Sequence, residues 1–150
     1  MGNTSMSYVG IGIFQPKTGH NVGTLLRTAV NLKADFVFVI GQRYKRQASD
    51  TVKTWARIPF YEYSSFQEFN NARPKGAQLV AIELDSKAVP LDTFKWPKQA
   101  IILLGAEDSG IPQQYLDRCQ HVVEIPTAQC LNVAVAGGIA LYHRNLQLGT

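Results

Sequence analysis

Residues 99–112 read QAIILLGAEDSGIP, and this stretch contains the most apolar part of the chain. Its run Ala100–Ala106 is far shorter than the roughly 20 apolar residues that a membrane-spanning helix requires. A short apolar run that ends in a turn is typical of a buried strand, and Gly105 and Gly110 permit such a turn. We therefore expect Gln99–Leu104 to be a strand buried on both faces.

On either side of this strand, apolar β-rich runs alternate with stretches of helical periodicity. The predicted strands are Tyr8–Phe14, Asp35–Ile40, Phe60–Tyr63, Gln78–Leu84 and His121–Ile125. The predicted helices are Asn21–Leu32, Thr51–Ala56, Ser65–Ala72, Pro112–Cys119 and Leu131–Leu148. This alternation predicts an α/β fold with a parallel sheet and helices on both faces. Because ligands bind such sheets beyond the carboxyl ends of the strands, the residues after each strand are the functional candidates.

The bulk composition is that of a folded protein, with 45% hydrophobic and 17% charged residues among 150, and we expect residues 1–150 to form one domain. The polar start Met1–Ser7 does not resemble a signal peptide, and no apolar run has the length of a membrane span. Together with two cysteines, Cys119 and Cys130, these features favour a cytoplasmic protein without membrane association. Metal binding is not expected, because three scattered histidines lack ligand spacing: His20, His121 and His143.

Positive charge is concentrated in the first half of the chain, although the formal net charge is only +4. Residues 1–75 hold ten Lys and Arg against four Asp and Glu, whereas residues 76–150 hold five against seven. The densest cluster is Arg43, Lys45 and Arg46, which can neutralise nucleic-acid phosphates. A solvated basic surface explains the same charges equally well.

The first stretch with candidate functional residues is HNVGTLLR at residues 20–27, on a predicted helix. Helical side chains lean toward the helix N-terminus, so we expect Arg27 to reach back over Gly23, where space is left for a ligand. The alternative is an ordinary surface arginine on an amphipathic helix.

The second stretch is LLGAEDSGIP at residues 103–112, directly after the most apolar strand. Its two glycines allow close backbone approach to a ligand, and Glu107 and Asp108 place negative charge at the mouth of a site. Such a loop can bind a nucleoside through backbone amides and carbonyls. The alternative is a plain strand-to-helix turn in which Ser109 or Gly110 lies near the helix N-cap.

The third stretch is IPTAQCLNVA at residues 125–134, between a strand and the last helix. We expect Asn132 in the first turn of that helix, where its amide can hold a ligand or a loop. Gly137 and Gly138 follow, and each glycine inside a helix costs about 1 kcal/mol relative to alanine. The pair predicts that another backbone packs closely there, from a threaded loop or a partner subunit.

These three stretches, taken in order, resemble the SPOUT methyltransferases, and more narrowly the SpoU-TrmH branch of RNA ribose 2'-O-methyltransferases. The resemblance rests on N-x-G-x-x-x-R at 21–27, L-G-x-E-x-x-G-I-P at 104–112 and I-P-x(4)-L-N-V at 125–133. It extends from about Tyr8 to Tyr142. It implies a SPOUT fold with a C-terminal deep trefoil knot, S-adenosylmethionine as cofactor and a homodimer packed through the first and last helices.

The resemblance also assigns roles to individual residues. The implied cofactor contacts are Leu84, Leu104, Gly105, Glu107, Ile125, Pro126, Leu131 and Asn132. The implied catalytic residues are Arg27, Asn21, Glu107 and Asn132, and the RNA-binding candidates are Arg27, Arg43, Lys45 and Arg46. The expected substrate is tRNA, with ribosomal RNA as the second candidate. Because arginine stays protonated at neutral pH, we expect Arg27 to orient the reacting groups rather than remove the ribose proton.

Two departures from the family pattern leave alternatives open. Thr127 and Cys130 stand where many relatives have methionine and serine, and Cys130 is a weaker helix cap than serine. A cysteine near a helix N-terminus also raises the possibility of a nucleophilic thiol, as in base methyltransferases. A catalytically inactive SPOUT domain that binds RNA or S-adenosylmethionine is the main alternative function. An unrelated nucleotide binder fits poorly, because Gln15–Gly19 matches neither dinucleotide nor P-loop signatures.

Overall fold

The computed structural model describes residues 6–42 and 57–149. Within them, a seven-stranded sheet has the order β3-β2-β1-β6-β4-β7-β5, and all neighbouring strands are parallel. The strands are β1 (Tyr8–Phe14), β2 (Phe36–Ile40), β3 (Phe60–Tyr63), β4 (Gln78–Ile82), β5 (Val89–Pro90), β6 (Gln99–Gly105) and β7 (His121–Glu124). The parallel α/β sheet predicted from the sequence is therefore confirmed.

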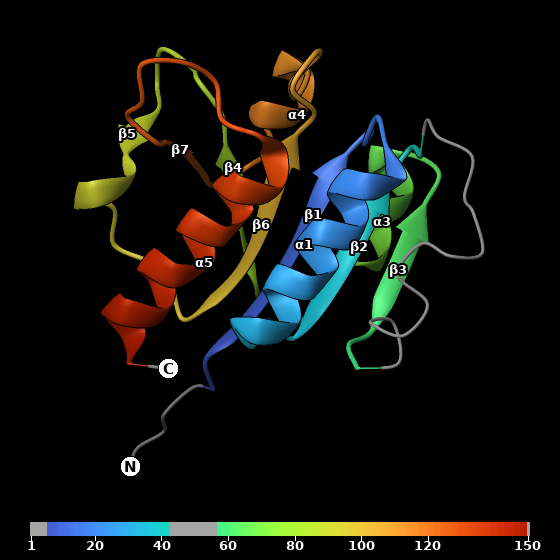
Figure 1. Cartoon of the computed structure of the whole chain (residues 1–150), viewed down its shortest axis with the longest axis horizontal. Coiled ribbons are helices and arrows are strands. Elements are labelled where there is room, and N and C mark those ends of the chain that lie inside the picture. Colours follow the sequence, from blue (N-terminus) through green and yellow to red (C-terminus); the bar gives the residue numbers. More distant parts are fainter. Residues whose placement is uncertain (1–5, 43–56, 150) are drawn as a thin grey trace.

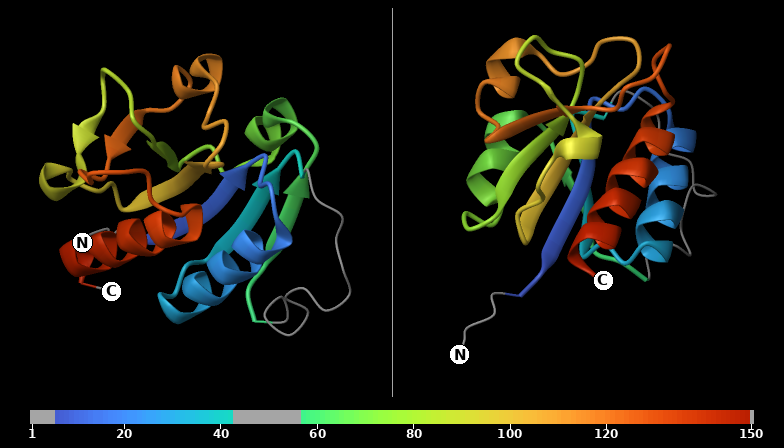
Figure 2. Two further views of the ribbon diagram at one scale, coloured as in Figure 1. Left: turned by 45° about the horizontal axis from the view of Figure 1, so that its top comes forward. Right: turned by 90° about the vertical axis from the view of Figure 1, so that its left-hand side faces the viewer.

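Helices cover both faces of the sheet, as Figures 1 and 2 show. One face carries α1 (Gly19–Asn31) and α5 (Val133–Leu148), which pack against one another. The other carries α3 (Phe66–Ala72) and the short α4 (Gln113–Leu116). Side chains alternate along each strand, so each face has its own apolar cluster, and both clusters include residues of β1, β2, β4 and β6.

The predicted elements are present wherever the structure describes the chain, and their ends differ by a few residues. The strands Tyr8–Phe14 and Phe60–Tyr63 match as predicted. The first helix begins earlier, because Thr18 caps it by accepting a hydrogen bond from the amide of Asn21 at 3.2 Å. The helix predicted near Pro112–Cys119 is reduced to the single turn of α4. The helix predicted at 51–56 lies outside the described residues, as do Arg43, Lys45 and Arg46.

Asn132 does not lie in the first turn of the last helix, as predicted, but is its N-cap. Its Oδ1 accepts hydrogen bonds from the amides of Ala134 at 2.9 Å and Val135 at 3.3 Å. These two amides would otherwise lack an intrahelical partner. Cys130 therefore has no capping role, and its difference from serine does not affect the start of α5.

Within the chain, the glycines of α5 are packed against side chains and not against the backbone of a threaded loop, while the approach of a partner subunit stays a prediction. A Cβ on Gly137 would lie 2.9 Å from Leu25 Cδ1 and 3.0 Å from Leu104 Cδ1. A Cβ on Gly138 would lie 3.2 Å from Thr28 Cγ2. The two glycines thus let α5 lie close to α1 and the sheet, where a larger residue would clash with core side chains.

The C-terminal half of α5 is fixed to the opposite, amino end of the sheet by Arg144, which is only 2% exposed. Its Nη2 donates to Ser7 Oγ and to the carbonyl oxygen of Lys98, both at 2.8 Å. Burial lowers the pKa of this guanidinium, while the negative charge of Asp35 acts in the opposite direction.

The order of the strands brings four connections to one edge of the sheet. From β1 the chain runs outward to β2, whereas from β6 it runs to β7 on the opposite side. The carboxyl ends of neighbouring β1 and β6 therefore form a topological switch point, where α/β proteins bind ligands. The loops after β4 and β7 begin at this same carboxyl end of the sheet. No helix within residues 6–42 and 57–149 combines the length and apolar character needed to cross a bilayer.

Candidate active site at the carboxyl edge of the sheet

A first pocket of about 440 Å³ lies where the loops after β4, β6 and β7 meet. We call it the loop pocket. Its wall combines apolar side chains with three carboxylates, those of Glu83, Glu107 and Glu124, which stand at or after the ends of three strands. Its lining residues are Ile82, Glu83, Leu84, Leu104, Gly105, Ala106, Glu107, Ser109, Gly110, Glu124, Ile125, Thr127, Ala128, Gln129, Cys130, Leu131, Val133 and Ala136.

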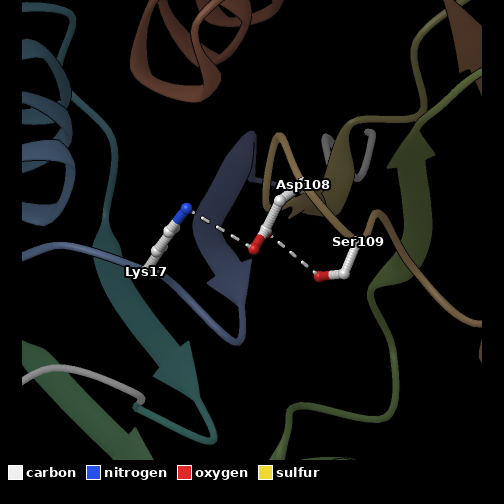
Figure 3. A network of polar contacts seen from close by, with 3 residues as sticks. All are labelled: Lys17, Asp108 and Ser109. Atoms are coloured by element: carbon white, nitrogen blue, oxygen red, sulfur yellow. Dashed lines mark hydrogen bonds and ion pairs between the residues drawn. The ribbon is translucent and has the colours of Figure 1, made fainter.

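A second pocket of about 320 Å³ lies at the switch point between β1 and β6, and we call it the polar pocket. Its lining residues are Ile13, Pro16, Lys17, Thr18, Asn21, Ala106, Glu107, Asp108 and Val133. Figure 3 shows Lys17, on the loop after β1, pointing toward Asp108 on the loop after β6. Lys17 Nζ and Asp108 Oδ2 are 3.9 Å apart, and Ser109 Oγ donates to Asp108 Oδ1 at 3.4 Å.

The two pockets share a wall made of Ala106, Glu107 and Val133. At the surface next to this wall, the amide of Asn132 donates from Nδ2 to Asn21 Oδ1 and to Glu107 Oε1, each at 3.0 Å. Because its Oδ1 caps α5, every polar atom of this amide is engaged and its orientation is determined. The structure thus brings together three of the four predicted catalytic residues, one from each sequence motif.

Six of the eight predicted cofactor residues line the loop pocket: Leu84, Leu104, Gly105, Glu107, Ile125 and Leu131. Pro126 and Asn132 do not. Pro126 is exposed, and the side chain of Asn132 is occupied by the cap of α5 and by Asn21 and Glu107. Asn132 therefore contacts the pocket only through Glu107, which it holds by a hydrogen bond.

Arg27, the fourth predicted catalytic residue, lines neither pocket of its own chain. It is exposed, and its Nη2 donates to Thr24 Oγ1 at 3.4 Å. Gly23 is buried and lines neither pocket, so a ligand above it stays a prediction. Arg27 follows Asn21 by six residues, which is a little under two turns of α1, and this separation places it away from the polar pocket that Asn21 lines.

A shallow apolar groove of about 480 Å³ lies beside Arg27, between α1 and α5. Thr24 and Thr28 contribute one side of it. The other side includes apolar residues of α5 that are unusually exposed: Val135 (49%), Ile139 (38%), Tyr142 (57%) and Leu146 (66%).

Glu83 and Lys17 are not among the predicted site residues, although Lys17 belongs to the basic first half of the chain that can neutralise phosphates. Glu83 follows β4 directly, and its Oε1 accepts a hydrogen bond from the amide of Ile111 at 2.9 Å. It lies in the strand-end position that the fold class singles out, but it was placed inside the predicted strand Gln78–Leu84, which ends at Ile82. Lys17 lies three residues after the end of β1, and a position shortly after a strand end is the signal that identifies both.

The two cysteines differ in their surroundings. Cys119 is partly buried, its thiol donates to the carbonyl oxygen of Tyr115 at 3.4 Å, and burial raises its pKa to about 12. A thiol in this state is a poor nucleophile at neutral pH. Cys130 is exposed at the loop pocket. Among the residues that the structure describes, no cluster of His, Cys, Asp and Glu is suited to a metal ion.

Comparison with known proteins identifies relatives of the chain. The chain is 31% identical over 133 residues to a 23S rRNA (guanosine-2'-O-)-methyltransferase of Acinetobacter baylyi, covering 82% of this chain and 53% of that relative. It is 27% identical to the tRNA (guanosine(18)-2'-O)-methyltransferase of Escherichia coli, covering 85% and 58%. The chain thus spans little more than half the length of these curated relatives.

A solved structure described as giving insights into 2'-OH methylation of C/U34 on tRNA superposes with a TM-score of 0.84. Its sequence is 25% identical, and the match covers 95% of this chain and 97% of that one. The model of the SpoU rRNA methylase family matches residues 9–142, which include both pockets and all three motifs. The chain belongs to the SpoU rRNA methylase family.

Proposed function

We propose that this protein is an S-adenosylmethionine-dependent RNA 2'-O-ribose methyltransferase that acts on tRNA. The observation that carries the proposal is the pair of adjoining pockets, which share Glu107, a residue that Asn132 holds by a hydrogen bond. Transfer of a methyl group requires donor and acceptor on either side of a short gap, in line with one another. Two adjoining pockets that share lining residues support such an arrangement, with one pocket for the donor and one for the acceptor.

The loop pocket fits the cofactor. Its apolar residues, including Leu104, Ile125 and Leu131, suit an adenine ring, and its exposed backbone groups can recognise ring nitrogens. Glu107 and Glu124 offer acceptors for the ribose hydroxyls and the ammonium group of the cofactor. When bound, S-adenosylmethionine supplies a methyl group activated by its sulfonium.

The polar pocket fits the nucleotide that accepts the methyl group. Lys17 can pair with a phosphate, while Asn21 and Thr18 offer hydrogen-bonding groups to a ribose. A ribose 2'-hydroxyl is a poor nucleophile, so the protein must position it and stabilise the negative charge that develops on its oxygen. The position of the pocket at the β1–β6 switch point is typical of ligand sites in this fold class.

Arg27 serves the active site of a second copy of the chain. It lies beside the apolar groove between α1 and α5, whose exposed Tyr142 and Leu146 provide a self-complementary surface for a homodimer. A guanidinium delivered across such an interface would orient the phosphate and hydroxyl of the bound nucleotide. This arrangement explains why Arg27 lines no pocket of its own chain.

The proposal also includes the knotted chain path and the cytoplasmic location that the family resemblance implies. The segment after β7 threads through a loop to form a deep trefoil knot, which is consistent with three distant loops forming one pocket wall. The reaction takes place in the cytoplasm, where the two free thiols, Cys119 and Cys130, are stable.

The choice of tRNA over ribosomal RNA rests on the solved structure that concerns C/U34 of tRNA, because the present chain covers 97% of it. The relative named for 23S rRNA is nearly twice as long as the matched region. Arg43, Lys45 and Arg46 are proposed RNA contacts, from sequence alone.

The test combines calorimetric titration with S-adenosylhomocysteine and transfer of labelled methyl groups into unmodified tRNA. We expect binding, and label in alkali-resistant dinucleotides, which only 2'-O-methylation produces. If the protein binds S-adenosylhomocysteine and methylates ribosomal RNA but not tRNA, then ribosomal RNA is the substrate. Failure to bind S-adenosylhomocysteine would contradict the proposal and favour a domain without catalysis.

A further inference from the structure

Glu83 extends from the end of β4 into the base of the loop that follows β6. Its Oε1 accepts a hydrogen bond from the amide of Ile111 at 2.9 Å, and its Oε2 accepts one from the amide of Leu84 at 3.3 Å. The side chain is half-buried and lines the loop pocket. One carboxylate thus connects two of the three loops that form this pocket.

The loop after β6 is folded closely around this carboxylate. A Cβ on Gly105 would lie 2.7 Å from Glu83 Oε1, and a Cβ on Gly110 would lie 2.9 Å from the same atom. The loop closes on itself through a bridge between Ala106 and Gly110, whose amide donates to the Ala106 carbonyl at 2.8 Å. These two glycines therefore leave the room that the Glu83 carboxylate needs beside the loop backbone, in addition to any room for a ligand.

We propose that Glu83 is a positioning residue, which holds residues 105–111 in the conformation that forms the wall of the loop pocket. The inference rests on the proposed function only in identifying that pocket as the cofactor site. Without an acceptor at this position, the amide of Ile111 would lose its partner beside a buried side chain. The two glycines would then let the loop adopt other conformations, and the pocket would have to be ordered at the moment of binding.

Cofactor binding and transfer should respond differently to the loss of Glu83. It lines the loop pocket but not the polar pocket, so its removal should weaken cofactor binding more than the chemical step. A purely global loss of stability would instead reduce the active fraction and leave the affinity of the remaining molecules unchanged.

The experiment compares Glu83→Ala with Glu83→Gln in the full chain. Glutamine keeps a side-chain oxygen that can accept from Ile111, but removes the charge. We expect Glu83→Ala to raise the Kd for S-adenosylhomocysteine and the KM for S-adenosylmethionine roughly tenfold or more, with kcat changed less than about threefold. Glu83→Gln should stay within about threefold of the wild type in all three constants.

Glu68→Ala is the matched control. Glu68 Oε1 also accepts one backbone amide, that of Ser64 at 2.8 Å, but at the start of α3, and it lines neither pocket. It should lower the melting temperature without changing the Kd for S-adenosylhomocysteine. Wild-type affinity in Glu83→Ala would overturn the proposal. Equal weakening in Glu83→Gln and Glu83→Ala would also overturn it, because the charge rather than the positioning would then matter.

Hydrogen exchange of the Ile111 amide separates this proposal from the proposed function. We expect protection in the wild type and in Glu83→Gln, and its loss in Glu83→Ala, whether or not any nucleoside binds. Rapid exchange in the wild type would contradict the positioning role directly. Intact protection together with a wild type that fails to bind S-adenosylhomocysteine would preserve the role of Glu83 in the loop and reject the cofactor site.

Discussion

The loop pocket and the polar pocket are neighbours, but they are built in different ways. The loop pocket is formed by three loops on the β4, β6 and β7 side, and it combines apolar side chains with the carboxylates of Glu83, Glu107 and Glu124. The polar pocket is formed on the β1 side, where charged and amide side chains such as Lys17, Asn21 and Asp108 provide the polar surface. The difference teaches that the first pocket depends on loop conformation and the second on individual side chains. Substitutions that affect the pockets separately therefore test the division.

The largest expected effect is that of Arg27→Ala, which touches neither pocket of its own chain. We expect turnover to fall on the order of 10³-fold, as for the loss of a group that stabilises developing charge, with little change in the Kd for S-adenosylhomocysteine. Single-turnover methyl transfer and calorimetry measure the two quantities. An active Arg27→Ala enzyme would reject the catalytic role.

The same variant tests the exchange of Arg27 between subunits. Leu131→Arg would block the loop pocket and is expected to be inactive alone. If Arg27 serves the partner, co-refolding equal amounts of Arg27→Ala and Leu131→Arg chains should restore about a quarter of the wild-type activity, because half of the dimers have one complete site. No recovery would show that Arg27 acts within its own chain.

The next effect concerns Asn132, which joins the two pockets. Asn132→Ala removes the N-cap of α5, at a cost of about 1 kcal/mol, and releases both Asn21 and Glu107. We expect turnover to fall about 100-fold, because two catalytic side chains lose their positions. Asn132→Asp is the control, since aspartate caps a helix but cannot donate to Glu107. The melting temperature of this variant should match the wild type, while its turnover stays low. Normal turnover would show that the hydrogen bond from Asn132 to Glu107 is not needed for catalysis.

A smaller effect is expected of Lys17→Ala, which changes the polar pocket alone. Its ion pair with Asp108 is exposed and should contribute less than about 1 kcal/mol to folding. If Lys17 pairs with a phosphate, the RNA affinity should fall and its salt dependence should weaken by about 0.9 in the log–log slope. Filter binding over a range of salt measures both, with the exposed Lys95→Ala as control. A weakened cofactor affinity would argue against two separate pockets.

The smallest effect is expected of Cys130→Ser in the loop pocket. Cys130 caps no helix, and direct transfer to oxygen needs no thiol, so kcat/KM should remain within about threefold of the wild type. The measurement is the rate of methyl transfer by the wild type and by Cys130→Ser under the same conditions. An inactive serine variant would revive the nucleophilic-cysteine mechanism.

Much of the architecture could be predicted because its signals are local. The apolar runs identify the strands, and Thr18 and Ser65 mark the starts of two helices through their own side-chain hydrogen bonds. The predicted boundaries of an element are wrong where a tertiary contact ends that element. The predicted strand at Gln78–Leu84 stops at Ile82, because Glu83 turns away to bind the amide of Ile111, which is 28 residues further along the chain.

The sequence by itself determined the α/β class, the three motifs and the residue types available for the reaction. The resemblance to the family placed Asn21, Glu107 and Asn132 in one group, but it did not indicate that one amide would connect the other two side chains. Only the tertiary structure decided that there are two pockets, that Arg27 faces away from both, and that Glu83 holds the loop between Gly105 and Gly110. The physical reason is that hydrogen bonds and pocket walls join residues far apart in sequence, whereas periodicity and capping report only on neighbours along the chain.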